Sequence, residues 1–194
     1  FTEETYTYHS ENGLTHTTKT TGTDATETIT SINEYTNYDS WLWRLTKEQL
    51  WGAGHLPLRE TGYDYEPVTG NMLWEERWNN TGVSPRTNYE YDSYGNQVKV
   101  WDANGNPPSI TIYDTATETY PVQIINPKGH TVLKEWDYRF GKETRIRDEN
   151  ENWTDYAYDP FGRQAQVDYP DGGQVTTEYH DDVIPRYILT KVKE

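Results

Sequence analysis

Apolar and polar residues alternate over short stretches of this 194-residue chain, and turn-forming residues separate the stretches. Alternation with a period of two is typical of a β-strand with one face more buried than the other. Clusters of Asp, Asn and Gly follow about every ten residues, and they favour tight turns because they tolerate positive φ or bond their own backbone. The pattern predicts consecutive antiparallel hairpins, with the clearest alternation at Val98/Val100, Ile110/Ile112, Tyr156/Tyr158, Ala165/Val167 and Val175/Thr177/Tyr179.

An aromatic–aspartate pair recurs along the chain at intervals of 21 to 28 residues. Such a constant period indicates a repeat architecture. We expect Tyr91, Tyr113, Trp136 and Tyr158 to lie in register on successive hairpins, ring beside ring, and the aspartate after each to accept backbone N–H bonds in the following turn. The pairs are Tyr38-Asp39, Tyr63-Asp64, Tyr91-Asp92, Tyr113-Asp114, Trp136-Asp137, Tyr158-Asp159 and, more loosely, Tyr179-His180-Asp181, and the accompanying turn glycines are Gly95, Gly105, Gly129, Gly141 and Gly162.

The composition supports an all-β fold. Seventeen Tyr and eight Trp suit pleated, half-buried surfaces, whereas a single Met argues against a helix bundle. One helical turn is expected at Thr46 to Trp51, where the sequence Lys-Glu-Gln-Leu favours helix. No window of the sequence is apolar enough for a transmembrane helix.

The net charge of −15 argues against a nucleic-acid partner, which needs a basic face. Glu135, Asp168 and Glu178 each stand beside an apolar or aromatic residue, so strand alternation places them on the opposite face. That acidic face either holds an unfolded cationic polypeptide by diffuse attraction or serves as a coat that keeps the protein soluble. The chain has no cysteine, which excludes disulfides and a cysteine nucleophile.

The copies at Tyr91-Asp-Ser-Tyr-Gly-Asn96 and Tyr156-Ala-Tyr-Asp-Pro-Phe-Gly-Arg163 resemble the YD repeat of the RHS family, which reads roughly Tyr-Asp-x-x-Gly-Arg. With Trp41-Leu-Trp-Arg-Leu-Thr46 and Gly62-Tyr-Asp-Tyr-Glu-Pro-Val-Thr-Gly70, the chain looks like the RHS stretch of insecticidal toxin complex cocoon proteins, the B/C components. Asn96 and Lys142 depart from the family pattern because they replace its Arg, and Glu151 stands where a turn glycine is expected.

The resemblance implies a twisted, curved sheet that forms one panel of a hollow RHS shell around a toxin or effector cargo. Residues 1–194 then form a single RHS region, a fragment of a larger bacterial protein, with the best repeats at 63–181. The implied partners are the rest of the shell and its C-terminal toxin cargo, and the implied location is secreted or at the cell surface.

The sequence gives little sign of catalysis, and we expect a non-enzymatic protein without cofactors. The Asp159-Pro-Phe-Gly sequence is similar to the self-cleavage site of the family, but its position favours an ordinary repeat turn. Asp148, Asn150 and Asn152 match the first ligands of a calcium loop, but Trp153 occupies the position that needs Gly, so a simple turn is favoured. A glycosidase-like pair of carboxylates is a distant alternative.

The tryptophans leave a second function open. Most are expected to fill the sheet surface by stacking across neighbouring strands. Exposed aromatic residues could instead bind glycans, which would make the chain a surface carbohydrate-binding or adhesion module. The candidates for such a platform are Trp41, Trp43, Trp74 and Trp78.

Overall fold

The structure is a computed structural model, and it describes residues 1–8, 14–23, 27–39, 42–80 and 82–193. The described residues form sixteen β-strands and one short 3-10 turn, Ala53–His55. The all-β prediction is therefore confirmed. Within these residues the chain divides into two compact units, Phe1–Pro108 and Ser109–Glu194.

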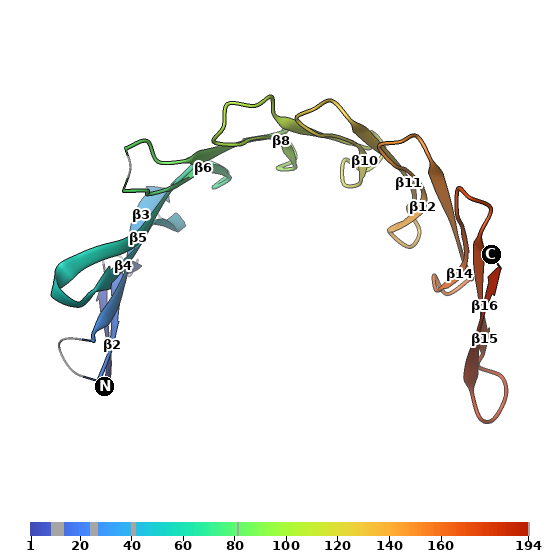
Figure 1. Ribbon diagram of the computed structural model, residues 1–194, viewed down its shortest axis with the longest axis horizontal. Helices are drawn as coiled ribbons and strands as arrows, with labels where there is room; N and C mark the ends of the chain where they lie inside the picture. The colour runs from blue at the N-terminus through green and yellow to red at the C-terminus, as the bar shows by residue number, and fades with distance from the viewer. Residues whose placement is uncertain (9–13, 24–26, 40–41, 81, 194) are drawn as a thin grey trace. The chain divides into compact units, whose positions relative to one another are not determined.

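The first unit is an antiparallel sheet in which each strand pairs with the next one in the chain (Figure 1). Its strands are β1 (Thr2–Tyr8), β2 (Leu14–Thr21), β3 (Ile29–Asp39), β4 (Leu42–Gly52), β5 (Leu56–Tyr65), β6 (Met72–Arg77), β7 (Arg86–Tyr91) and β8 (Gln97–Trp101).

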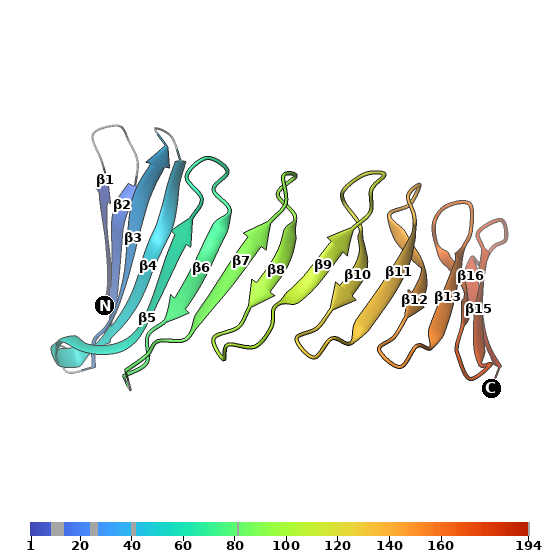
Figure 2. The ribbon, with the colours of Figure 1, turned by 90° about the horizontal axis from the view of Figure 1, so that it is seen from above.

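The second unit has the same arrangement. Its connecting turns lie alternately at one end of the strands and at the other (Figure 2). Its strands are β9 (Ser109–Tyr113), β10 (Pro121–Ile125), β11 (Thr131–Asp137), β12 (Lys142–Arg147), β13 (Trp153–Tyr158), β14 (Gln164–Asp168), β15 (Gln174–His180) and β16 (Tyr187–Lys193).

The helical turn expected at Thr46 to Trp51 is wrong, because these residues lie within strand β4. Their backbone groups pair with β3 on one side and β5 on the other. Two ladders of backbone hydrogen bonds outweigh the weak helix propensity of four residues. A 3-10 turn follows β4 directly, at Ala53–His55.

Neither unit has the buried core of a two-layered domain. Val167, with 4% of its surface exposed, is the one buried hydrophobic side chain among the described residues. Most other strand residues are half-buried, since they lie on one layer of sheet. Backbone pairing and contacts between adjacent hairpins must therefore supply much of the stability.

The pairing register of the second unit places its repeat aromatics on one face, which we call the aromatic face. Cross-strand partners share a face, and the pairs Ile146↔Thr154, Tyr156↔Val167 and Val167↔Val175 connect the strands. The residue before each aromatic points to the opposite face and is exposed. The aromatic face carries Tyr113, Trp136, Tyr158 and Tyr179, and the exposed neighbours on the opposite face are Ile112, Glu135, Ala157 and Glu178.

Candidate functional site

Four aspartates of the repeat, Asp92, Asp114, Asp137 and Asp159, accept backbone N–H bonds in the turns that follow them, as predicted. Asp92 and Asp159 each accept two backbone N–H bonds, from the residues two and four positions later. Asp137 accepts the N–H of Arg139. The carboxylates replace missing backbone partners in the turns, in the manner of Asx-turns. The five predicted turn glycines all have positive φ, between 62° and 88°.

Asp114 accepts more backbone N–H bonds than the other three aspartates. Only 4% of it is exposed, and it accepts N–H bonds from Ala116, Thr117, Thr119 and Tyr120 at 2.6–3.1 Å. Burial alone raises the pKa of a carboxyl group, but these N–H bonds outweigh burial and hold the pKa of Asp114 far below its usual range.

The repeat of β5 and β6 is shifted by two residues from the predicted pair Tyr63-Asp64. The turn is organised by Glu66, whose carboxylate accepts the N–H groups of Val68 and Thr69. Asp64 instead accepts a hydrogen bond from the Tyr38 hydroxyl, at 2.8 Å. Tyr65 and Glu66 therefore occupy the repeat positions in this hairpin.

Five repeat aromatics lie beside a β-bulge, because the partner strand of their hairpin carries one extra residue there. The break in register falls at the same step in five hairpins. The aromatic residues and their partners after the break are Tyr65↔Met72, Tyr91↔Gln97, Tyr113↔Pro121, Trp136↔Glu143 and Tyr158↔Gln164. These aromatics therefore hold the same position within their own hairpins.

In the second unit, three repeat aromatics donate a side-chain hydrogen bond to a backbone carbonyl oxygen of the preceding hairpin. Trp136 donates from Nε1 to the carbonyl oxygen of Pro121 at 2.9 Å. The Tyr158 hydroxyl donates to Glu143 O at 2.7 Å, and the Tyr179 hydroxyl donates to Gln164 O at 3.0 Å. The sequence separation is 15 residues in all three bonds, so they are equivalent ties between successive hairpins.

In three turns of the second unit, the residue that closes the turn packs on the next repeat aromatic. The Arg163 guanidinium carbon lies 4.0 Å from the centroid of the Tyr179 ring. Lys142 Nζ lies 5.4 Å from the Tyr158 centroid, and the Tyr120 and Trp136 centroids are 4.9 Å apart. The ring contacts described here thus join a repeat aromatic to a turn-closing side chain, and the expected row of repeat rings packed on one another stays a prediction.

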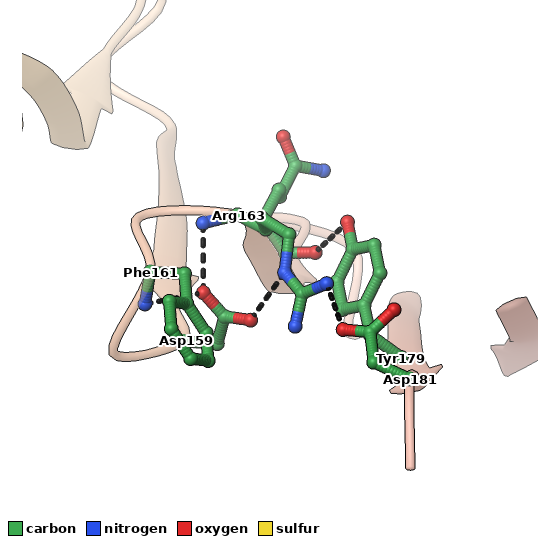
Figure 3. Close-up of polar contacts among 6 residues, drawn as sticks. Asp159, Phe161, Arg163, Tyr179 and Asp181 are labelled. Atoms are coloured by element: carbon green, nitrogen blue, oxygen red, sulfur yellow. Dashed lines mark hydrogen bonds and ion pairs between the residues drawn. The ribbon is translucent and has the colours of Figure 1, made fainter. Parts of the chain in front are cut away.

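Arg163 forms the fullest of these contacts (Figure 3). Its Nε donates to Asp159 Oδ2 at 2.7 Å, within its own turn, and its Nη1 donates to Asp181 beyond β15. Burial raises the pKa of Asp159, but the backbone N–H and the guanidinium of Arg163 outweigh this and lower it. One side chain therefore joins the β13–β14 turn to the following hairpin.

Sequence reasoning missed this role of Arg163, although a signal was present. Arg163 follows the turn glycine and precedes Tyr179 by 16 residues, as Lys142 precedes Tyr158. Lys142 replaces the Arg of the family pattern, but its ammonium group still lies over the ring of the next repeat aromatic, Tyr158.

The candidate calcium ligands form a turn instead. The Asp148 carboxylate accepts the N–H groups of Asn150 and Asn152 and the side-chain amide of Asn152. Over the described ranges, no three His, Cys, Asp or Glu residues cluster as a metal site would require.

The four candidate glycan-binding tryptophans do not form one visible platform. Trp41 lies outside the described residues, and Trp43 is half-buried. Trp74 is covered by the Arg86 guanidinium, 4.1 Å from its ring centroid. Trp78 is 39% exposed, so the glycan-binding alternative stays a prediction that rests mainly on this residue.

The acids expected opposite the aromatic residues do lie there, together with basic residues. Glu178 pairs with Lys191 on the neighbouring strand, and Asp155 pairs with Arg145 at 2.8 Å. The face is therefore mixed in charge. Its role as a cargo-holding surface or as a solubility coat stays a prediction. In the part of the chain that the structure describes, no helix is long and apolar enough to span a membrane.

These features define a β-hairpin repeat whose units are tied by aromatic and turn-closing residues. Residues 136–174 match the model of the RHS repeat family. The resemblance to the RHS/YD-repeat family is therefore confirmed, with the model match running from the end of β11 to the first residue of β15. A comparison with the curated proteins found no match.

Solved structures of a Tc toxin complex share the fold. The crystal structure of TcdB2-TccC3 without its hypervariable C-terminal region matches 91% of this chain at 15% identity, with a TM-score of 0.50. TcdB2-TccC3-TEV matches the same share at 15% identity and a TM-score of 0.51. A Photorhabdus luminescens Tc holotoxin pore with a TccC3 mutation matches 96% at 17% identity and a TM-score of 0.51. The chain spans 11% of the length of each of these structures.

Proposed function

We propose that this chain is a non-catalytic structural segment of an RHS-type shell that encapsulates a toxin or effector cargo. The observation that carries the proposal is the repeated tie between successive hairpins, made three times at the same spacing in the second unit. Such ties extend a single-layered sheet without a core of its own. A wall needs this construction, whereas an enzyme needs a pocket with converging polar groups.

The structural neighbours support the same role. Their names describe a toxin complex, one form of which lacks a hypervariable C-terminal region and another of which is a holotoxin pore. By this likeness, the partners of the chain are the remaining shell and an enclosed cargo, and the protein acts outside the producing bacterial cell or at its surface.

The proposal is tested by the accessibility of the two faces in the whole protein that contains this chain. Thr154 and Ala157 lie on the same strand, β13, and strand alternation places them on opposite faces. This chain has no cysteine of its own, so Thr154→Cys and Ala157→Cys each add one defined thiol. Each variant is labelled with a small maleimide and with a bulky polyethylene-glycol maleimide.

In a closed shell, the small reagent reaches both thiols, and the bulky reagent reaches only the outer one until detergent opens the shell. Equal labelling of both positions by the bulky reagent, in the folded whole protein, would overturn the shell role. The isolated chain is the control, since both faces of a lone sheet are open to both reagents.

A further inference from the structure

A side chain covers the ring of the repeat aromatic in several hairpins. Arg163 covers Tyr179 and Lys142 covers Tyr158, while the Arg44 guanidinium carbon lies 5.8 Å from the Tyr65 centroid. The covering group is a cation in all three cases. Cations favour the faces of aromatic rings because the ring quadrupole is negative there.

The hairpin of β5 and β6 closes its turn with a shorter residue. Glu66 N–H donates to Asn71 O at 2.8 Å, as Asp159 N–H donates to Arg163 O at 2.8 Å, so Asn71 is the equivalent of Arg163. Asn71 is neutral, and its side chain is three atoms shorter than that of arginine. The next repeat aromatic along the chain is Tyr91, the equivalent of Tyr179.

A cavity of about 300 Å³ lies where the long side chain would be. This is the lower end of the size range of small-ligand pockets. It is lined by Glu66, Asn71, Leu73, Tyr89, Tyr91 and Asp92 among others, and no Lys or Arg is among the lining residues.

The lining suits a guanidinium group. Tyr89 and Tyr91 supply aromatic surface, and Glu66 and Asp92 supply negative charge. Turn N–H bonds lower the pKa of Glu66. Burial raises the pKa of Asp92, but its hydrogen bonds from Asn96 and the turn N–H groups outweigh burial and lower it, so both carboxylates are ionised at neutral pH. Arginine fits better than lysine, because its planar group stacks on rings and is weakly hydrated.

We propose that this cavity binds the arginine side chain of another polypeptide segment, which takes the position that Arg163 fills from within its own chain at Tyr179. The inference goes beyond the shell role and does not rest on it. A sheet with this cavity can bind an extended basic segment through one arginine side chain of that segment.

The test uses two short unstructured peptides, identical except that one carries arginine and the other citrulline, its neutral isostere. Binding to the chain is followed by calorimetry and by the NMR shifts of the tyrosine rings. We expect the arginine peptide to bind, with the Tyr91 ring signals shifting, and the citrulline peptide to bind at least about tenfold more weakly. Binding should also weaken as salt screens the carboxylates.

Asn71→Arg provides the decisive variant, since the new side chain can fill the cavity from within. It should lower the affinity for the arginine peptide at least about tenfold. Val68→Arg is the matched control: it adds the same charge to the same turn at a position that is 84% exposed, and binding should persist.

The converse variant, Arg163→Asn, removes the covering side chain from Tyr179 and should create a second site for the arginine peptide. Equal binding of the two peptides, or full binding by Asn71→Arg, would overturn the proposal. Either of these results would leave the face-accessibility experiment on the shell role unaffected.

Discussion

Backbone strain at single residues marks where this repeat departs from its own pattern. Glu151 has a φ of 68° and Glu118 a φ of 53°, although neither is glycine. The N–H of Glu151 bonds to Asp148 O, as the N–H of Gly162 bonds to Asp159 O, so Glu151 occupies a glycine position of the turn. A side chain in this left-handed region costs about 1–2 kcal/mol.

Glu151→Gly should therefore stabilise the protein, by about 0.5–1 kcal/mol after the larger chain entropy of unfolded glycine is subtracted. Urea denaturation followed by tryptophan fluorescence measures the change. Lys128→Gly is the control, because Lys128 lies in an equivalent turn just before Gly129 and does not have positive φ. A loss of stability in Glu151→Gly like that in the control would contradict the strain argument.

Asp114 should make stability depend on pH. Its pKa is lower in the folded than in the unfolded chain, so its contribution is complete above the unfolded pKa, about 4, and is lost as the pH falls through the folded pKa. Asp114→Asn should lower the urea midpoint at about pH 7, and the gap to the unmodified protein should narrow at about pH 3. An equal gap at both pH values would show that the charge does not matter.

Sequence reasoning located most turn residues but misplaced one pair. In Tyr63-Asp64-Tyr65-Glu66, both dipeptides offer an aromatic residue and an acid, and the shorter acid fitted the pattern better. Spacing would have separated them: Gly70 follows Glu66 by four residues, as Gly141 follows Asp137. Turn geometry depends on this spacing more than on the length of the acid.

Contacts between neighbouring hairpins extend to the turns themselves. A Cβ built on Gly162 would lie 2.8 Å from Phe140, which belongs to the preceding turn. A Cβ on Gly141 would likewise lie 2.9 Å from the Tyr120 hydroxyl. Successive turns on this edge therefore pack against one another, and glycine provides the space.

Gly162→Ala should destabilise the sheet more than Gly172→Ala. Both glycines have positive φ, but a Cβ on Gly172 meets no atom within 4 Å. Backbone strain of about 1–2 kcal/mol is common to both variants, so the difference in urea midpoint isolates the clash with Phe140. Adding Phe140→Ala to Gly162→Ala should recover part of the difference, and equal midpoints for the two single variants would contradict turn-to-turn packing.

At the level of elements, the period-two pattern predicted the strands well, whereas the ties between hairpins were missed. Strand pairing is local in this fold, so alternation and turn residues suffice to predict it. The bond from Tyr158 to Glu143 depends instead on the bulge and on ring orientation, which only the folded sheet defines. The expected helix at Thr46 to Trp51 failed for a related reason, because pairing on both sides overrides local propensity.

At the level of the whole molecule, the first and last strands differ from the rest. β1 pairs with β2 and β16 pairs with β15, and the structure describes no second partner for either strand. Every residue of both strands is exposed. Free strand edges readily pair with another strand, so these edges suit contact with further β-strands.

Amide hydrogen exchange of the isolated chain should therefore be fastest in β1 and β16 among the strands. A strand with one ladder opens more easily than one held on both sides, such as β13. Mass spectrometry of exchanged peptides measures the difference, and it should disappear for these edges when the chain is part of the whole protein. Protection of β16 equal to that of β13 in the isolated chain would contradict the prediction.

The ties from Trp136, Tyr158 and Tyr179 each reach only the hairpin immediately before them. The length of the sheet is therefore not encoded in any one contact. Removal of residues 137–158 would join Trp136 to Asp159 and restore an aromatic–aspartate pair, with one hairpin fewer and the remaining register intact. Such a sheet can gain or lose whole hairpins during evolution by duplication or deletion, so its length can change while each hairpin stays the same.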